Sequence, residues 1–279
     1  GALTIGEILR RSTAYLREKG SASPRLDADL LLAHALGVER LQLYTDSERP
    51  LNPDELARAR ELVGRRARRE PVAYLLGERA FRRLRLGVGP EVLVPRPETE
   101  VLVEWALAVA PEGGTVLDWG TGSGAIALAL ADEGPALRVT ALDRSAGALE
   151  RARANGALCE ASDVEWLLSD GFAAVAGRRF DVIAANPPYL SAADLAQAPP
   201  ELAFEPEGAL VSGPTGLEAV EGIAREAPDH LEPGGWVLIE VGEGQAEAAE
   251  GLLRAAGLGD VGHRDDLAGI ARAVGGRRG

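Results

Sequence analysis

The first 75 residues carry apolar positions at the spacing of helices. Apolar residues over 5–16 recur every three or four positions, and the Thr-x-x-Glu sequence over 4–7 is a capping box that begins such a helix. Two further helices are predicted over 24–36 and 53–69, because each has a proline directly after a capping residue. We expect these segments to form a small helical domain over residues 1–75.

The pattern changes after this domain. Residues 76–94 contain short apolar pieces separated by glycines, which predicts a β-hairpin linker. From residue 95, apolar runs of strand length alternate with helical stretches, and this alternation indicates a parallel sheet covered by helices. Strands are expected over 115–118, 138–143, 164–169, 180–185 and 236–241, helices over 101–110, 125–131, 146–155, 216–230 and 245–256, and a turn over 233–235.

The end of the chain completes this architecture. Two short strands, 259–264 and 270–274, are expected to form an antiparallel hairpin at the edge of the sheet. The predicted fold class is therefore α/β, with a Rossmann-like domain over residues 95–279, a mostly parallel sheet and an antiparallel edge hairpin. The small helical domain and the hairpin linker precede it.

The first strand of the α/β domain ends in an acid and a glycine-rich turn, Asp118-Trp-Gly-Thr-Gly-Ser-Gly124. The alternating glycines let a ligand approach the backbone, and the helix that follows presents free amides. The spacing also satisfies the dinucleotide fingerprint, so a nicotinamide or flavin enzyme is an alternative. However, an acid at Asp118 would repel a pyrophosphate, whereas it would suit the ammonium of S-adenosylmethionine, directly or through water. S-adenosylmethionine is therefore the predicted cofactor.

Two later strands end in residues that suit the rest of this cofactor. Asp143 ends the second strand, where a carboxylate can accept hydrogen bonds from both ribose hydroxyls. Asp170 and Gly171 follow the third strand and are placed to meet the adenine. The residues predicted to bind the cofactor at these three strand ends are Asp118, Gly120, Thr121, Gly122, Ser123, Gly124, Asp143, Asp170 and Gly171.

A second turn, Asn186-Pro187-Pro188-Tyr189, ends the fourth strand and supplies the predicted catalytic residues. An amide nitrogen is a poor nucleophile, so its methylation requires alignment and acceptors for its N–H groups. The Asn186 side-chain oxygen and the Pro187 carbonyl can accept these bonds. The two prolines stiffen the backbone, and Tyr189 is expected to form a planar wall. Because adenine N6 presents the same conjugated amine, this turn alone does not distinguish the two substrates.

At these residues the chain resembles the protein-(glutamine-N5) methyltransferases that modify peptide chain release factors. The resemblance covers nearly the whole chain, and its discriminating segment is Pro-Arg-Pro-Glu-Thr-Glu over 95–100. It implies N5-methylation of the glutamine in the Gly-Gly-Gln loop of a release factor, with residues 186–189 holding that glutamine. It also implies that Asn186 is a cofactor-binding residue. The family often has a large side chain where this chain has Gly171, so adenine packing is left to neighbours such as Phe172.

Composition narrows the classes of partner. The formal net charge of −13 opposes non-specific attraction to nucleic acid and suits a small ligand or a basic protein. With one cysteine and three scattered histidines, no metal site is expected. The chain has no apolar run of membrane-spanning length and no signal pattern at its start, so we expect a cytoplasmic protein without membrane contact.

Three hypotheses follow from the sequence. The first is a monomeric enzyme that acts on release factors without a direct nucleic-acid requirement. The second is an amino-methyltransferase for adenine N6 or guanine N2 of a nucleic acid, which a contiguous basic surface around the cleft would favour. The third is a non-catalytic binding module, against which the intact acceptor groups of Asn186 argue.

Overall fold

The computed structural model describes residues 3–161 and 163–279. The chain divides into two compact units, Gly1–Gly77 and Glu78–Gly279, and each is described by itself. The first two residues of the predicted helical domain lie outside the described part. Among the described residues, no helix combines the length and the apolar character needed to cross a membrane.

The N-terminal unit is helical, as predicted. Its helices are α1 (Ile5–Glu18), α2 (Pro24–Leu36), α3 (Gln42–Thr45), α4 (Pro53–Ala67) and α5 (Val72–Leu76). The predicted capping box is confirmed, since the Thr4 hydroxyl accepts from the Glu7 amide and the Glu7 carboxylate accepts from the Thr4 amide. Apolar faces of these helices meet in one core that includes the fully buried Leu16 and Leu31. The short helices α3 and α5 were not predicted.

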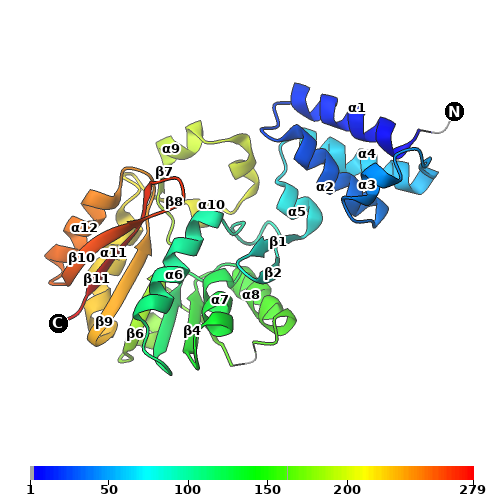
Figure 1. The fold of residues 1–279 in the computed structure, drawn as a ribbon. Helices are drawn as coiled ribbons and strands as arrows, with labels where there is room; N and C mark the ends of the chain where they lie inside the picture. Colours follow the sequence, from blue (N-terminus) through cyan, green and yellow to red (C-terminus); the bar gives the residue numbers. More distant parts are fainter. Residues whose placement is uncertain (1–2, 162) are drawn as a thin grey trace. The chain divides into compact units, whose positions relative to one another are not determined.

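The C-terminal unit is built on a seven-stranded sheet with the order β10-β11-β9-β6-β3-β4-β5 (Figure 1). Its strands are β3 (Thr115–Trp119), β4 (Arg138–Asp143), β5 (Glu165–Leu168), β6 (Phe180–Ala185), β9 (Leu231–Glu240), β10 (Gly259–Asp265) and β11 (Ala271–Arg277). Neighbouring strands from β9 to β5 run parallel, whereas β11 runs antiparallel to β9 and β10. The predicted fold class, including the antiparallel edge hairpin, is confirmed.

Helices cover both faces of this sheet (Figure 1). Alternate residues of β3 show why: Val116 packs in the core beneath α6 (Glu100–Val109) and α7 (Ala125–Glu133), and Leu117 packs in the opposite core. That second core lies beneath α11 (Glu218–Glu226) and α12 (Ala246–Ala255). The two cores thus fix the sheet whose strand ends carry the predicted turns.

The β-hairpin consists of β1 (Glu78–Phe81) and β2 (Leu84–Gly87), which pair antiparallel. It belongs to the C-terminal unit, because the chain divides before Glu78. Asn155 of α8 (Ala146–Leu158) attaches it to the glycine-rich turn: the side chain bonds both backbone groups of Gly87 and donates to the Ser123 carbonyl at 2.8 Å.

Two predictions near β9 differ from the structure. The predicted turn over 233–235 lies inside β9. These residues form an irregularity in the strand: the pairing of β6 with β9 shifts its register between Phe180 and Val182, and Gly234 has a positive φ of 78°. The predicted helix 216–230 is shorter: α11 ends at Glu226 and a 3-10 turn, Ala227–His230, follows at Pro228, whose missing N–H interrupts the α-helical pattern.

The long connection after β6 holds short elements that the sequence pattern did not predict. They are β7 (Leu190–Ser191), α9 (Ala192–Gln197), the 3-10 turn Pro200–Phe204, α10 (Glu207–Leu210) and β8 (Val211–Gly213). Each is too short to show a period in the sequence. Two further 3-10 turns, Pro97–Thr99 and Ala173–Val175, precede α6 and β6.

The order of the strands places the site. The chain leaves β3 toward β4 on one side and later forms β6 on the other, so β3 lies at the point where the strand order reverses. Parallel sheets bind ligands outside the carboxyl ends of the strands at such a point. The two turns predicted from the sequence follow β3 and β6 and therefore lie side by side.

Candidate active site

The glycine-rich turn begins where β3 ends and reaches across to β4. The amides of Gly120 and Thr121 both donate to the Leu142 carbonyl, at 2.9 and 2.8 Å. Gly122 has a φ of 55° and Gly124 a φ of 86°, values that side chains disfavour, and Gly124 directly precedes α7. The turn therefore exposes backbone to the space above the sheet without intervening side chains.

Asp118 lies beneath this turn. It is fully buried, and its Oδ2 accepts from the Thr121 hydroxyl at 2.7 Å and from the Ala127 amide at 3.1 Å. Burial raises the pKa of Asp118 to about 7. Its Oδ1 has no hydrogen-bond partner among the described residues, and Asp118 is not among the residues that line the cavity described below. A contact of Asp118 with the cofactor ammonium, directly or through water, stays a prediction. The observed hydrogen bonds hold the glycine-rich turn.

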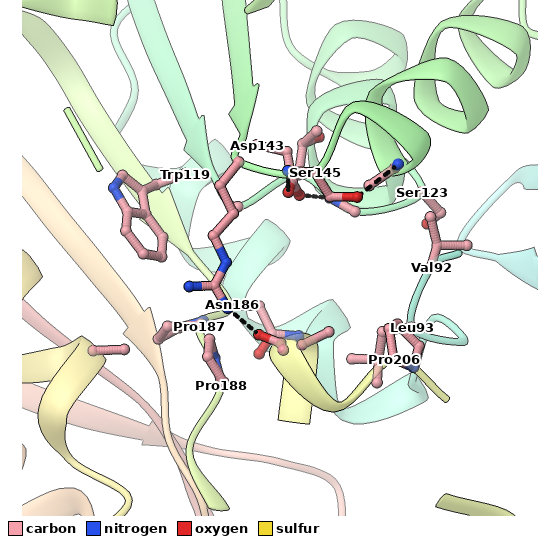
Figure 2. A pocket seen from close by; sticks show the side chains of 18 of the residues that line it. Val92, Leu93, Trp119, Ser123, Asp143, Ser145, Asn186, Pro187, Pro188 and Pro206 are labelled. Atoms are coloured by element: carbon pink, nitrogen blue, oxygen red, sulfur yellow. Dashed lines mark hydrogen bonds between the residues drawn. The ribbon is translucent and has the colours of Figure 1, made fainter. Parts of the chain in front are cut away.

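Asp143 ends β4 and faces the cavity (Figure 2). Its Oδ2 accepts from the Gly122 amide and its Oδ1 from the Ser145 amide, both at 2.9 Å. A carboxylate has about four lone-pair sites. One site on each oxygen is therefore left for a ligand, which fits the two adjacent hydroxyls of a ribose.

The segment after β5 forms the neighbouring wall of the cavity. Ser169 fixes it, because its hydroxyl donates to the Gly171 carbonyl at 2.8 Å and accepts from the Ala174 amide at 3.0 Å. Asp170 and Gly171 line the cavity. A Cβ built on Gly171 would meet no atom within 4 Å, so this position leaves open space.

The expectation that Phe172 packs against adenine is wrong. Phe172 is buried in the core beneath α11, where its ring stacks on His230 at 4.6 Å and lies 6.4 Å from that of Trp119. Gly171 has a φ of 55°, so the chain turns there and directs the next side chain into the core. Trp119, which ends β3, is an aromatic residue that does line the cavity.

The second turn continues β6. Asn186, Pro187 and Pro188 line the same cavity as the glycine-rich turn (Figure 2). Tyr189 is not among the described lining residues; its hydroxyl donates to Glu240 at 3.4 Å, and its carbonyl accepts from the Gln245 side chain at 2.9 Å. Burial raises the pKa of Tyr189 to about 12, so the phenol stays protonated. Tyr189 thus anchors the turn, and its expected role as a planar wall stays a prediction.

The cavity has a volume of about 560 Å³, which is in the range of sites for small organic ligands. It contains most of the predicted cofactor residues and three of the four predicted catalytic residues. Gly120, Thr121, Gly122, Ser123, Asp143, Asp170, Gly171, Asn186, Pro187 and Pro188 line it, whereas Asp118, Gly124 and Tyr189 are not among the described lining residues.

Other functional candidates were missed by the sequence reasoning. Glu240 ends β9 with 1% of its surface exposed, and its Oε2 accepts from the Thr99 hydroxyl at 2.6 Å. Burial raises the pKa of Glu240 to about 7. The sequence did contain a signal for Glu240: this acid follows the apolar run Trp-Val-Leu-Ile, just as Asp118 and Asp143 follow the apolar runs of their own strands.

An ion pair and a crossing arginine also shape the cavity. Arg96, which lines it, pairs with the almost fully buried Glu205, and Glu205 accepts from the Val94 amide at 3.0 Å. The proline-rich segment over 95–100 is thereby fixed to the connection after β6. Arg144 reaches from the end of β4 to the Gly208 carbonyl at 3.0 Å. Both contacts join segments that lie far apart in the sequence.

Comparisons with known proteins extend across the chain. The family model of the PrmC N-terminal domain matches residues 7–77, and that of the methyltransferase small domain matches residues 97–202. A protein of Geobacter sulfurreducens, named release factor glutamine methyltransferase, is 44% identical over 279 residues, which are 99% of this chain and 97% of that protein. A protein of Burkholderia pseudomallei with the same name is 46% identical over 276 residues, 95% of this chain and 97% of its own length.

Solved structures show the same fold over about three quarters of the chain. A methyltransferase from Pyrococcus furiosus aligns with a TM-score of 0.55 and 21% identity, over 77% of this chain and 98% of its own. The 16S rRNA N2 G1207 methyltransferase of Thermus thermophilus aligns with the same score and identity, over 72% of this chain and 50% of its own. At this identity the two likenesses show the architecture alone.

Proposed function

Because the chain belongs to the family of release factor glutamine methyltransferases, we propose that it methylates the side-chain N5 nitrogen of a glutamine in a peptide chain release factor. The substrate glutamine is that of the Gly-Gly-Gln loop. The observation that supports this proposal most directly is that two turns, one suited to S-adenosylmethionine and one to a planar amide, line a single cavity.

The residues present fit S-adenosylmethionine. Asp143 keeps a free acceptor site on each oxygen for the ribose hydroxyls, and the turn over 120–124 offers bare backbone to the amino-acid part. Asp170 and Gly171 provide the adenine end. When bound, S-adenosylmethionine supplies the methyl group: its S–CH3 bond breaks as the N5–CH3 bond forms, S-adenosylhomocysteine leaves, and one N5 proton is released.

The second turn prepares the glutamine amide for this reaction. The lone pair of an amide nitrogen is delocalised, so the nitrogen gains nucleophilic character only when it is held in position and its N–H groups are accepted. We assign these two bonds to the Asn186 Oδ1 and the Pro187 carbonyl. The two hydrogen bonds of Tyr189 hold the turn in place, so that less reorganisation is needed when the substrate binds.

Selectivity requires more than the glutamine side chain, because one amide offers few contacts. We propose that the helical unit, Gly1–Gly77, binds the release factor at a second surface. Among the described residues of this unit, four large apolar side chains are exposed, and Leu41 is 72% exposed. Large apolar side chains on a surface are typical of interaction sites when they gather there. The four are Tyr15, Leu26, Leu41 and Tyr44. The enzyme is proposed to act as a monomer.

The test is methyl transfer in vitro. The purified chain is incubated with S-adenosylmethionine carrying a labelled methyl group and with a purified bacterial release factor, followed by peptide mapping. Label on the glutamine of the Gly-Gly-Gln loop supports the proposal. A release factor with asparagine in place of that glutamine is the matched control and should remain unlabelled. Label on ribosomal RNA or DNA, and none on the release factor, would favour the nucleic-acid hypothesis instead.

A further inference from the structure

Four polar side chains join the second turn to the buried end of β9. Asn186 Nδ2 donates to Thr99 Oγ1 at 3.4 Å, and Thr99 Oγ1 donates to Glu240 Oε2 at 2.6 Å. The Tyr189 hydroxyl donates to the other oxygen, Glu240 Oε1, at 3.4 Å. Thr99 is 4% exposed and Glu240 1% exposed, so water competes little for the bond between them. Residues far apart in the sequence thus form one hydrogen-bonded chain.

The direction of this chain follows from counting protons. A threonine hydroxyl has a single proton. The short bond to the Glu240 carboxylate uses that proton, so Thr99 can only accept from Asn186. The NH2 group of Asn186 must then face Thr99, and Oδ1 lies on the opposite side of the planar carboxamide. Among the described residues, no donor is bonded to this Oδ1, and Asn186 lines the cavity.

We propose that Glu240 is a positioning residue for methyl transfer, acting through Thr99 to make Asn186 present its oxygen rather than its NH2 group to the substrate amide. This inference rests on the proposed function, because it assigns the orientation that a glutamine NH2 requires. A reversed Asn186 would place two donors against each other and leave the substrate N–H without its acceptor. The carboxylate thus selects one of two orientations of the same side chain.

The charge of Glu240 determines the direction, so protonation should reverse it. Burial raises the pKa of Glu240 to about 7; the Thr99 bond and Arg272 of β11 oppose this rise, and Glu98 adds to it. Arg96 and Arg272 also face the neighbouring Tyr189. A protonated Glu240 can donate to Thr99, which is then free to donate to Asn186 Oδ1. We expect this inactive orientation to accumulate as the pH falls below about 7.

The kinetic test uses two variants of Thr99 and a matched threonine elsewhere. Thr99→Val keeps the shape but has no hydroxyl, and kcat on the release factor should fall about tenfold, as expected for one positioning hydrogen bond. The KM for the release factor and the Kd for S-adenosylmethionine should change by less than about twofold, and Thr99→Ser should restore most of kcat. Thr140→Val is the control, since the equally buried Thr140 donates to Glu165 at 2.9 Å and does not line the cavity.

The pH profile tests Glu240 itself. The fall of kcat below about pH 7 in the parent should be absent in Glu240→Gln, because a glutamine does not titrate. If Thr99→Val retains the parental kcat and pH profile, or if Glu240→Gln retains the acid limb, the inference is overturned. Retention of kcat by Thr140→Val, together with its loss in Thr99→Val, supports it.

A readout without turnover separates this inference from the proposed function. In protein labelled with 15N in asparagine side chains, the Asn186 NH2 resonance should shift with pH at the midpoint of Glu240. That midpoint is measured by 13C labelling of glutamate. The shift should disappear in Thr99→Val and persist in Thr140→Val. If the parent methylates no release factor but the Asn186 resonance still titrates with Glu240, the proposed function fails and the positioning of Asn186 through Thr99 stands. If the Asn186 resonance does not change at the midpoint of Glu240, the positioning inference is overturned.

Discussion

Asp118→Asn is expected to stabilise the folded protein at pH 8 but not at pH 4.5. The native carboxylate is fully buried, and burial raises its pKa from 3.8 to about 7. The folded state therefore favours the protonated acid. The contribution of the protonated acid to the free energy of unfolding is fully present below pH 3.8 and is lost as the pH rises toward 7. Above about pH 7 the free energy of unfolding no longer changes with pH on account of this group. Asparagine keeps the shape and has no charge to bury.

The magnitude follows from the size of the pKa shift. The difference between about 7 and 3.8 is roughly three pKa units, which correspond to about 4 kcal/mol at ~1.4 kcal/mol per unit. The amide NH2 of the variant would occupy the position of Oδ1, which has no partner among the described residues, at a cost of about 1–3 kcal/mol. A net gain of about 1–3 kcal/mol at pH 8 is expected, and about 3 kcal/mol of the difference should disappear by pH 4.5.

Urea unfolding followed by tryptophan fluorescence is the appropriate assay. All four tryptophans, Trp105, Trp119, Trp166 and Trp236, belong to the C-terminal unit, so the signal reports on the unit that contains Asp118. Glu240 also has a raised pKa and adds the same pH trend to both proteins, so the difference between parent and variant isolates Asp118. Asp170→Asn, an exposed carboxylate at the same cavity, is the control. An equal difference at both pH values would refute the reasoning.

Three further predictions concern the site and the helical unit. Asp143→Ala should weaken S-adenosylmethionine binding at least tenfold in calorimetry, because two charge-assisted bonds to the ribose are lost; unchanged affinity would remove Asp143 from the cofactor site. Asn186→Ala should lower kcat about a hundredfold or more while unfolding in urea changes little, and near-normal turnover of the folded variant would contradict its role. A truncation that begins at Glu78 should bind S-adenosylmethionine but lose activity on intact release factor, and full activity with unchanged half-saturation would show that the helical unit makes no second contact.

The strand ends of the C-terminal unit could be predicted because each carries two local signals. An apolar run of strand length precedes a polar or glycine-rich turn at both Asp118 and Asn186, and β3 and β6 end within one residue of these positions. Alternation with helices then implied a parallel sheet, so these turns had to share one edge. The two signals were enough to find most of the cavity wall.

The connection after β6 could not be predicted in the same way. One contact that fixes this connection is the ion pair of Arg96 with Glu205, which joins positions more than a hundred residues apart. A contact of this kind depends on the assembled sheet and leaves no period in the sequence. The placement of Phe172 in the core has the same origin, because the positive φ of Gly171 decides which way the next side chain points.

Burial determines which of three similar acids can contact a ligand. Asp118, Asp143 and Glu240 each end or nearly end an apolar strand at the same edge, and the sequence pattern makes them equivalent. Asp143 alone among them lines the cavity and keeps acceptor sites free, whereas Asp118 and Glu240 are buried with pKa values of about 7. Burying two carboxylates destabilises the fold. Asp118 accepts a hydrogen bond from the Thr121 hydroxyl and thereby fixes the backbone of the glycine-rich turn. Glu240 accepts one from the Thr99 hydroxyl and thereby fixes the orientation of a side chain in the cavity. A strand-ending acid therefore predicts the position of the cavity, and only the three-dimensional structure separates the acid that lines it, Asp143, from the two that are buried, Asp118 and Glu240.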